Sequence, residues 1–375
     1  MLTKRKNAVV ALVVCLATLV VAGGRTNFFG VLGTEVDRPT VGDEVGFAQT
    51  SWMLLWGTDA EVDRDLDAMA ATGGKWLRLD FDWQSAEPSP GNYRWTYIDR
   101  VVNRAQARGL RILATPAYTP AWARPAGTSD KHPPTDPKAY AAFVKAAAQR
   151  YGPRGVHHWE IWNEPNIPLF WQPLPNPAQY AALLRASSAA IRSVDRQAVI
   201  VTAGLAPAAD TSDGRHISPR TFLSKLYQAG VQDSFDAVGM HPYAWPYGIS
   251  APGDWNQWYS LSKTYDLMVA NGDSAKKIWA TEYGAPTGTN SRSVTEAGQA
   301  TFVQEAFSAW PTMPWAGPLF WYSFRDQGND RSDPEDNFGI MRRDFSAKPA
   351  MSAFAKAMAV PTATAPAPAP TPTPT

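Results

Sequence analysis

Two glutamates in this 375-residue chain stand at the ends of short apolar stretches and precede turn-forming residues. Glu164 lies in the stretch 156–166, whose first half is β-branched and aromatic and which Pro165 interrupts. Glu282 ends the apolar half of the stretch 276–286, again before Gly and Pro. Short apolar runs bounded by such residues predict buried strands that enter loops. Apolar surroundings raise a carboxyl pKa, so a carboxyl group placed there can stay protonated and donate its proton.

Paired carboxylates on separate strands suit the hydrolysis of a glycosidic bond. One protonates the leaving oxygen, and the other attacks the sugar or activates water. For Glu164 alone, capping of the helix that follows is the alternative. The second glutamate, Glu282, in the same kind of setting favours the chemical interpretation.

The sequence around each glutamate resembles a known motif. The run WNEPN at 162–166 resembles the acid/base signature of the clan A retaining glycoside hydrolases, which include families 5 and 39. The run TEYG at 281–284 resembles the nucleophile strand of that clan, and the resemblance extends over most of 45–358. It implies that Glu164 is the acid/base and Glu282 the nucleophile.

Two polar residues are expected beside this pair. Arg78 lies in an apolar strand pattern and needs a partner, because an unpaired buried charge is costly. By resemblance it approaches the nucleophile, and the alternative is a structural ion pair with Asp80, Asp82 or Glu160. Asn163 matches the amide that contacts the 2-hydroxyl of the sugar in this clan.

Several ring-bearing residues also match positions of the clan. His241 and Tyr243 resemble the pair that lines the catalytic subsite of the clan and forms hydrogen bonds with the nucleophile. For His241 the alternative is a structural role, which is common for a histidine at a strand end. Trp321 resembles the platform under the sugar, with a place in the barrel core as the alternative. Tyr118 and Trp122 are expected either to form outer subsites or to hold their own loop together.

Strand-like and helix-like segments alternate along the chain, which predicts a parallel sheet built from βαβ units. Eight such units predict the α/β class and a single (β/α)8 TIM barrel, with its active site at the carboxyl ends of the strands. An open doubly wound sheet would need a glycine-rich loop after the first strand, and none follows it. The expected strands are Val45–Ser51, Lys75–Phe81, Leu110–Thr115, Val156–Trp162, Ala198–Ala203, Phe235–Met240, Lys277–Thr281 and Pro318–Tyr322. The expected helices are Asp59–Thr72, Tyr97–Arg108, Pro137–Tyr151, Pro177–Val194, Ser218–Ala229, Trp255–Asn271, Ser293–Trp310 and Pro349–Met358.

Composition narrows the class of ligand. The net charge of +1 suggests neither a polyanion nor a membrane surface as partner. The five histidines form no HExxH pattern, and no nucleotide-binding fingerprint is present. We therefore expect no metal, no cofactor, no nucleotide and no nucleic acid. The nucleophile elbow of serine hydrolases is also absent.

The two ends differ in composition from the middle. Residues 1–24 combine a basic start with an apolar run, which predicts a signal peptide or an uncleaved signal anchor. Residues 25–44 are expected to be a leader, 45–358 the catalytic barrel, and 359–375 a disordered Pro/Ala/Thr-rich tail. The only cysteine, Cys15, lies in the apolar run. These features predict a secreted or cell-surface/cell-wall-associated protein without disulfides, which meets a membrane only through an uncleaved anchor. A monomer is expected.

The sequence therefore predicts a secreted retaining glycoside hydrolase that acts on a polysaccharide or oligosaccharide by double displacement. The alternative is a non-catalytic polysaccharide-binding barrel of the cell wall. Glucan, mannan, xylan, and polymers containing galactofuranose or arabinose all remain open as substrates, as does endo against exo action.

Overall fold

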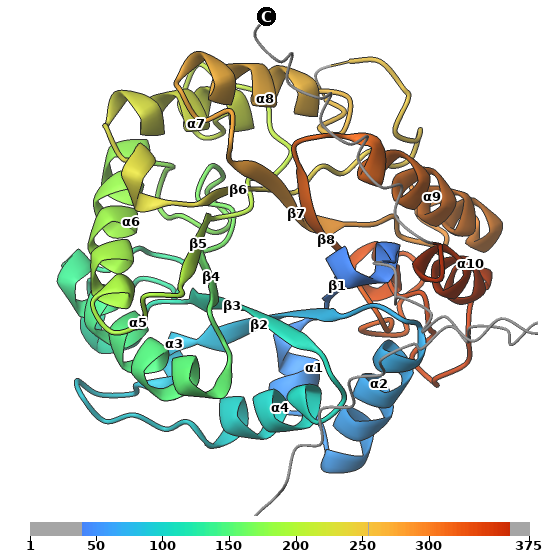
Figure 1. Cartoon of the computed structure of the whole chain (residues 1–375), viewed down its shortest axis with the longest axis horizontal. Helices are drawn as coiled ribbons and strands as arrows, with labels where there is room; N and C mark the ends of the chain where they lie inside the picture. Colours follow the sequence, from blue (N-terminus) through green and yellow to red (C-terminus); the bar gives the residue numbers. More distant parts are fainter. Residues whose placement is uncertain (1–39, 254, 361–375) are drawn as a thin grey trace, which may run out of the picture. The chain divides into compact units, whose positions relative to one another are not determined.

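The structure, a computed structural model, describes residues 40–253 and 255–360. Eight parallel strands pair in chain order and close into a barrel, and helices surround this ring (Figure 1). The predicted (β/α)8 TIM barrel is confirmed. The strands are β1 Val45–Ala48, β2 Trp76–Asp82, β3 Arg111–Ala117, β4 His158–Ile161, β5 Val199–Thr202, β6 Ala237–Met240, β7 Lys277–Tyr283 and β8 Ala316–Trp321.

Several helices begin where the sequence carries capping residues. The Asp136 side chain accepts a hydrogen bond from the Lys138 N–H, and Pro137 occupies the first turn of its helix. A reciprocal capping box between Thr58 and Glu61 starts another helix. The helices are α1 Ser51–Leu55, α2 Asp59–Ala71, α3 Trp83–Ala86, α4 Thr96–Gln106, α5 Pro137–Tyr151, α6 Pro177–Arg192, α7 Pro219–Gln228, α8 Leu261–Ala270, α9 Glu296–Ala309 and α10 Pro349–Met358.

Two apolar layers follow from the alternation of side chains along each strand. Inward-facing residues such as Trp76, Trp279 and Phe320 fill the barrel interior with an aromatic cluster. Outward-facing residues pack against the helices in a much larger core. Because the lower interior is filled, the free space lies above it, at the carboxyl ends of the strands.

Several predicted boundaries on the catalytic face were wrong, and two of them concern the first strand and the loop that carries Trp255. The first strand ends at Ala48 instead of Ser51, and the short helix α1 begins at Ser51. Helix α8 begins at Leu261 instead of Trp255, so Trp255 belongs to the loop between β6 and α8. The second difference leaves Trp255 in a loop at the carboxyl ends of the strands, where the sequence predicted a helix.

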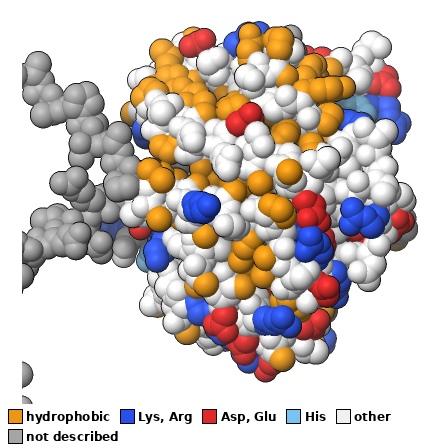
Figure 2. All heavy atoms as spheres, turned by 90° about the vertical axis from the view of Figure 1, so that its right-hand side faces the viewer, with side chains coloured by type: hydrophobic (Ala, Val, Ile, Leu, Met, Phe, Trp, Pro, Cys, Tyr) orange, Lys and Arg blue, Asp and Glu red, His pale blue; other side chains and the backbone are white. Residues whose placement is uncertain are grey.

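Charged side chains of both signs lie next to one another in the lower part of Figure 2. Three aspartates of α2 form salt bridges with three arginines, two in α4 and one just after its end, each about one helical turn apart. Exposed pairs of this kind contribute little individually. The residues are Asp59, Asp63 and Asp67, with Arg100, Arg104 and Arg108.

The ends of the described segment meet at the base of the barrel. The Val41 N–H donates a hydrogen bond to the Val360 carbonyl at 2.9 Å. Val41 is also buried in the core, so residues 41–44, assigned to the leader, pack with the barrel. The predicted signal 1–24, most of the leader and the tail from 361 lie outside the described residues. Within the described ranges, no helix has the length and apolar character needed to cross a membrane.

Candidate active site

A cavity of about 970 Å³ opens at the carboxyl ends of the strands. Its lining includes both predicted glutamates, Glu164 and Glu282, together with Arg78, Asn163 and Tyr243. A volume of this size is at the upper end of ligand-binding pockets. Active sites of such barrels occupy this face, so the position fits a catalytic cavity.

Glu164 is presented by an irregular turn after β4. Its φ of 43° and the φ of 75° at Trp162 lie in the left-handed region, which non-glycine residues seldom adopt. The turn is held by Asn166, whose side-chain amide donates to the Ala206 and Ile217 carbonyls, each at 2.9 Å. Backbone strain at such positions costs about 1–3 kcal/mol each and is typical of functional sites.

Glu282 reaches the cavity because β7 is irregular near its end. Inward-facing residues of β7 alternate at Trp279 and Thr281, so regular alternation would direct residue 282 outward. The pairing of β7 with β8 passes from Ala280↔Leu319 to Tyr283↔Trp321, so β7 holds one extra residue. A bulge of this kind re-aims a side chain, and here it turns the Glu282 carboxylate inward.

Arg78 connects the base of the site to Glu282. Its guanidinium donates to Glu160 at 2.5 Å, to Glu282 at 2.6 Å and to Asn163 Oδ1 at 2.7 Å. Glu160 is fully buried and also accepts hydrogen bonds from Thr115, Thr281 and the Gly204 N–H. Arg78 therefore contacts both the nucleophile implied by the resemblance and one of the structural partners named as the alternative.

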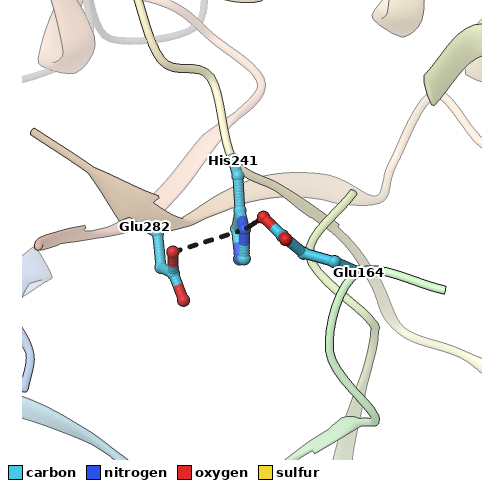
Figure 3. Close-up of side chains that lie close together, drawn as sticks. All are labelled: Glu164, His241 and Glu282. Atoms are coloured by element: carbon cyan, nitrogen blue, oxygen red, sulfur yellow. Dashed lines mark hydrogen bonds and ion pairs between the residues drawn. The ribbon is translucent and has the colours of Figure 1, made fainter. Parts of the chain in front are cut away.

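His241 lies between the two glutamates (Figure 3). Its Nδ1 is 2.7 Å from Glu164 Oε1 and 3.5 Å from Glu282 Oε2. The resemblance implied a hydrogen bond to Glu282, whereas the short contact is with Glu164. The ring is fully buried, and a Cβ on Gly204 would lie 2.1 Å from its Nε2. Only glycine fits there, and the ring is thereby held against the backbone. Tyr243 completes the contacts by donating its O–H to Glu282 Oε2 at 2.9 Å.

The two carboxyl groups differ electrostatically. Burial raises the pKa of Glu164 to about 8, an effect that Arg78 opposes and Glu160 reinforces. Burial also raises the pKa of Glu282, while His241 and Arg78 lower it. We predicted that Arg78 would depress this pKa, and its contribution has that sign, but burial is larger. Burial lowers the pKa of His241, which favours its neutral form.

Among the described residues, Glu164, His241 and Glu282 form a group whose potential metal-ligating atoms lie within 4.8 Å of one another. Both oxygens of Glu282 already accept hydrogen bonds, from Arg78 and Tyr243. A metal ion there would face the guanidinium of Arg78 at close range, and like charges repel. We therefore interpret this group as a pair of reacting carboxylates.

Trp321 occupies a core position, the alternative to the platform that the resemblance implied. Trp321 is fully buried against Tyr283 and Phe307, in the layer between strands and helices. Alternation along β8 instead directs Phe320 and Tyr322 inward, and Tyr322 lines the cavity. The platform predicted for residue 321 is therefore one residue out of register.

The two aromatic residues predicted after β3, Tyr118 and Trp122, lie in different surroundings. Trp122 donates its indole N–H to the Glu87 carbonyl at 2.8 Å and packs edge-on against Trp83, so it holds its own loop and is not a cavity residue. Tyr118 does line the cavity, where its ring packs edge-on against Trp162. Burial raises the pKa of Tyr118 well above its ordinary value, so its hydroxyl stays protonated.

Asp80, Tyr322, Trp255 and Glu335 are among the cavity residues that escaped the sequence reasoning. Asp80 and Tyr322 stand at inward-facing positions of β2 and β8, so the alternation of those strands carried the signal. The Tyr322 hydroxyl donates to Glu335 at 3.0 Å and accepts from Gln327 at 2.6 Å. Trp255 and Glu335 lie in long connections, for which no periodic signal exists.

Comparison with known proteins places this geometry among carbohydrate-active enzymes. Residues 39–315 match the family described as cellulase, glycosyl hydrolase family 5. A probable mannan endo-1,4-beta-mannosidase F of Emericella nidulans is 25% identical over 298 residues, which cover 70% of this chain and 65% of the relative. A beta-xylosidase of Geobacillus stearothermophilus is 34% identical over 116 residues, or 28% of this chain and 23% of the relative. The chain thus spans just under two thirds of the mannosidase and a quarter or less of the xylosidase.

Solved structures share the fold. A family 39 glycoside hydrolase of Bacteroides cellulosilyticus superposes with a TM-score of 0.68 at 24% identity, over 87% of this chain and 64% of that one. A monomeric beta-xylosidase of Caulobacter crescentus gives a TM-score of 0.66 at 17% identity, over 86% of this chain and 69% of that one. At these identities the likeness establishes the architecture, and the chemistry has to be argued from the site.

Proposed function

This chain belongs to glycosyl hydrolase family 5, the cellulase family, and we propose that it cleaves β-linked mannose- or xylose-containing glycans by double displacement. It is a glycoside hydrolase of the clan recognised in its sequence. The two-step mechanism, the roles of individual residues and the choice of sugar are the content of the proposal.

The observation that carries the proposal is the spacing of the two carboxylates. Oxygens of Glu164 and Glu282 lie within 4.8 Å of each other. Retaining enzymes hold their carboxyl groups about 5–5.5 Å apart, whereas inverting enzymes need about 6.5–9.5 Å to admit a water. The short spacing leaves room for a sugar carbon bonded to one carboxylate, and it supports retention.

In the first step, a carboxylate oxygen of Glu282 forms a bond to the anomeric carbon as the bond to the leaving oxygen breaks. Glu164, with a pKa of about 8, is protonated at neutral pH and gives its proton to that oxygen. Arg78 and Tyr243 each hold one oxygen of Glu282 and so fix its direction of approach. His241, neutral because of burial, orients Glu164 through its 2.7 Å contact.

In the second step, Glu164 takes a proton from water, whose oxygen displaces Glu282 from the anomeric carbon. Esterified Glu282 no longer carries a negative charge within 4.8 Å of Glu164. Loss of that charge lowers the pKa of Glu164 and helps it to act as a base. One residue thus serves as acid and then as base, and the configuration at the anomeric carbon is retained.

The choice of mannose or xylose rests on the names of the relatives, a mannan endo-1,4-beta-mannosidase and a beta-xylosidase. We also propose that the protein acts outside the cell, on the evidence of the basic and apolar residues 1–24. A polysaccharide or oligosaccharide is then its partner.

The test compares two variants on dinitrophenyl β-mannoside and dinitrophenyl β-xyloside. Glu282→Gln should abolish turnover, because no covalent bond to the sugar can form. Glu164→Ala should still release dinitrophenol in a burst, since this leaving group needs little protonation, and should then accumulate glycosyl-enzyme. Azide needs no base, so it should restore turnover of Glu164→Ala and yield the β-glycosyl azide.

The opposite pattern would exchange the two roles. In that case azide would rescue Glu282→Gln with inverted configuration and leave Glu164→Ala unaffected. A non-catalytic carbohydrate-binding barrel, the alternative function, would bind mannan or xylan without release of sugar by the unmodified protein.

A further inference from the structure

The loop between β6 and α8, residues 241–260, carries an aromatic side chain that the proposed chemistry does not use. Trp255 lines the cavity of the catalytic face, yet 46% of its surface is exposed. An indole ring is large and mainly apolar, so a half-exposed position in a cavity forgoes part of the free energy that its burial would contribute to folding. Its position therefore calls for an explanation.

The loop fixes this ring in place. A Cβ on Gly253 would lie 2.5 Å from Trp255 Nε1, so the indole rests directly on the glycine backbone. The neighbouring Asn256 is fully buried and donates to the carbonyls of Gly248 at 3.0 Å and Ala251 at 2.7 Å. A fully satisfied buried amide makes a loop rigid. Trp255 is thus an exposed ring held by a braced backbone.

A second aromatic ring supports the first. Tyr247 packs edge-on against Trp255, with ring centroids 5.4 Å apart and an interplanar angle of 75°. An edge-on neighbour restrains the indole without covering it. Trp255 therefore keeps its exposed surface in the cavity that also contains Glu164 and Glu282.

We propose that Trp255 forms an outer sugar-binding subsite of the catalytic cavity, so that the substrate extends beyond the sugar bonded to Glu282. This inference rests on the proposed function and makes it more specific, because it adds a second sugar-binding position to the one at Glu282. The flat C–H face of a pyranose supplies the apolar surface that stacks on an indole, and the hydroxyls at its edge remain in water. A fixed ring binds it at low entropic cost.

The chain supplies a matched control in Trp56. This residue follows α1, is 48% exposed, and also has one edge-on tyrosine, Tyr97, at 4.5 Å. It is not among the residues that line the cavity. Two tryptophans of equal exposure and similar surroundings therefore differ in their relation to the cavity.

The experiment compares a substrate confined to the catalytic subsite with one that extends beyond it. The probes are β-mannosyl fluoride and β-1,4-mannohexaose, or β-xylosyl fluoride and β-1,4-xylohexaose if the xylosides are the ones cleaved. For Trp255→Ala, the ratio of kcat/KM on the hexasaccharide to kcat/KM on the fluoride should fall about tenfold, the size of one ring-stacking contact. Trp255→Phe should recover part of this loss, and Trp56→Ala should keep the ratio of the unmodified protein.

Binding gives a readout that does not depend on turnover. In the Glu282→Gln background, calorimetry with the hexasaccharide should show about tenfold weaker binding when Trp255→Ala is added. Equal losses in Trp255→Ala and Trp56→Ala, or an unchanged ratio and unchanged binding in Trp255→Ala, would overturn the subsite. Failure of the unmodified protein to cleave either fluoride or hexasaccharide would instead refute the proposed function, and binding would still decide whether Trp255 contacts the glycan. A thermal unfolding midpoint equal to that of the unmodified protein verifies that each variant is folded.

Discussion

Replacing Glu164 by glutamine should stabilise the protein at neutral pH. Burial raises the pKa of this carboxyl from its ordinary value of 4.5 to about 8. Between these two values the folded protein holds a proton that the unfolded chain releases, so unfolding becomes easier as the pH rises. Glutamine resembles the protonated acid in shape, keeps the contact with His241, and cannot lose a proton.

The size of the effect follows from the shift. A difference of about 3.5 pH units corresponds to about 5 kcal/mol at full expression, using about 1.36 kcal/mol per unit. The stabilisation of Glu164→Gln should be absent below pH 4.5, reach about 3 kcal/mol at pH 7 and stop growing above about pH 8. It is positive throughout, because a raised carboxyl pKa opposes folding once the unfolded group has ionised.

Urea unfolding of both proteins at a series of pH values measures this difference. Glu61→Gln is the control, because a hydrogen bond from the Thr58 backbone lowers the pKa of Glu61. A lowered pKa stabilises the fold at pH values above the unfolded value, so Glu61→Gln should lose stability as the pH rises, opposite in sign to Glu164→Gln. A stability difference for Glu164→Gln that is constant from pH 4 to 8, or that is negative at pH 7, would refute the reasoning.

Three further outcomes follow from the same contacts. Turnover of the glycan should fall with a midpoint near pH 8 as Glu164 loses its proton, and this alkaline limb should be weaker for a dinitrophenyl glycoside; a pH–rate profile measures both. Tyr243→Phe removes a hydrogen-bond donor to the Glu282 carboxylate and should lower kcat roughly 10- to 100-fold. The hydroxyl of Tyr227 lies outside the cavity, so Tyr227→Phe should leave kcat unchanged in the same kinetic assay. Arg78→Met leaves the buried Glu160 without its cation and should cost about 3–5 kcal/mol in urea unfolding, and equal stability would show that this ion pair is not structural.

The sequence predicted the barrel because its signals are repetitive. Apolar runs alternate with helical patterns such as 137–151, and caps like Asp136 mark where helices start. Both glutamates could be assigned to the catalytic face because strand ends of parallel sheets share one edge. That Arg78 faces inward also follows from the alternation of β2, two residues after Trp76.

Other parts of the site depend on breaks in that regularity. The extra residue in β7 that turns Glu282 inward has no counterpart in composition or periodicity. Trp321 was expected in the cavity, but the neighbouring Tyr322 lines it, since a shift of one residue exchanges the two faces of a strand. Trp255 was assigned to a helix that begins only at Leu261, because Gly253 and the buried Asn256 hold Trp255 in a loop. Such contacts across a loop exist only once the chain has folded.

Arg78 forms salt bridges with two carboxylates, Glu160 and Glu282, and only one of them reacts in the proposed mechanism. Before the reaction, its single positive charge faces the charges of Glu160 and Glu282. When Glu282 becomes an ester, its charge disappears, and a buried arginine with no other partner would then be left uncompensated at a cost of several kcal/mol. Glu160 prevents this, because it is fully buried and does not react, and it keeps its bond to Arg78 Nε. The fully buried ion pair beneath the cavity therefore keeps the guanidinium in place through both steps, so that the same donor is available when Glu282 regains its charge.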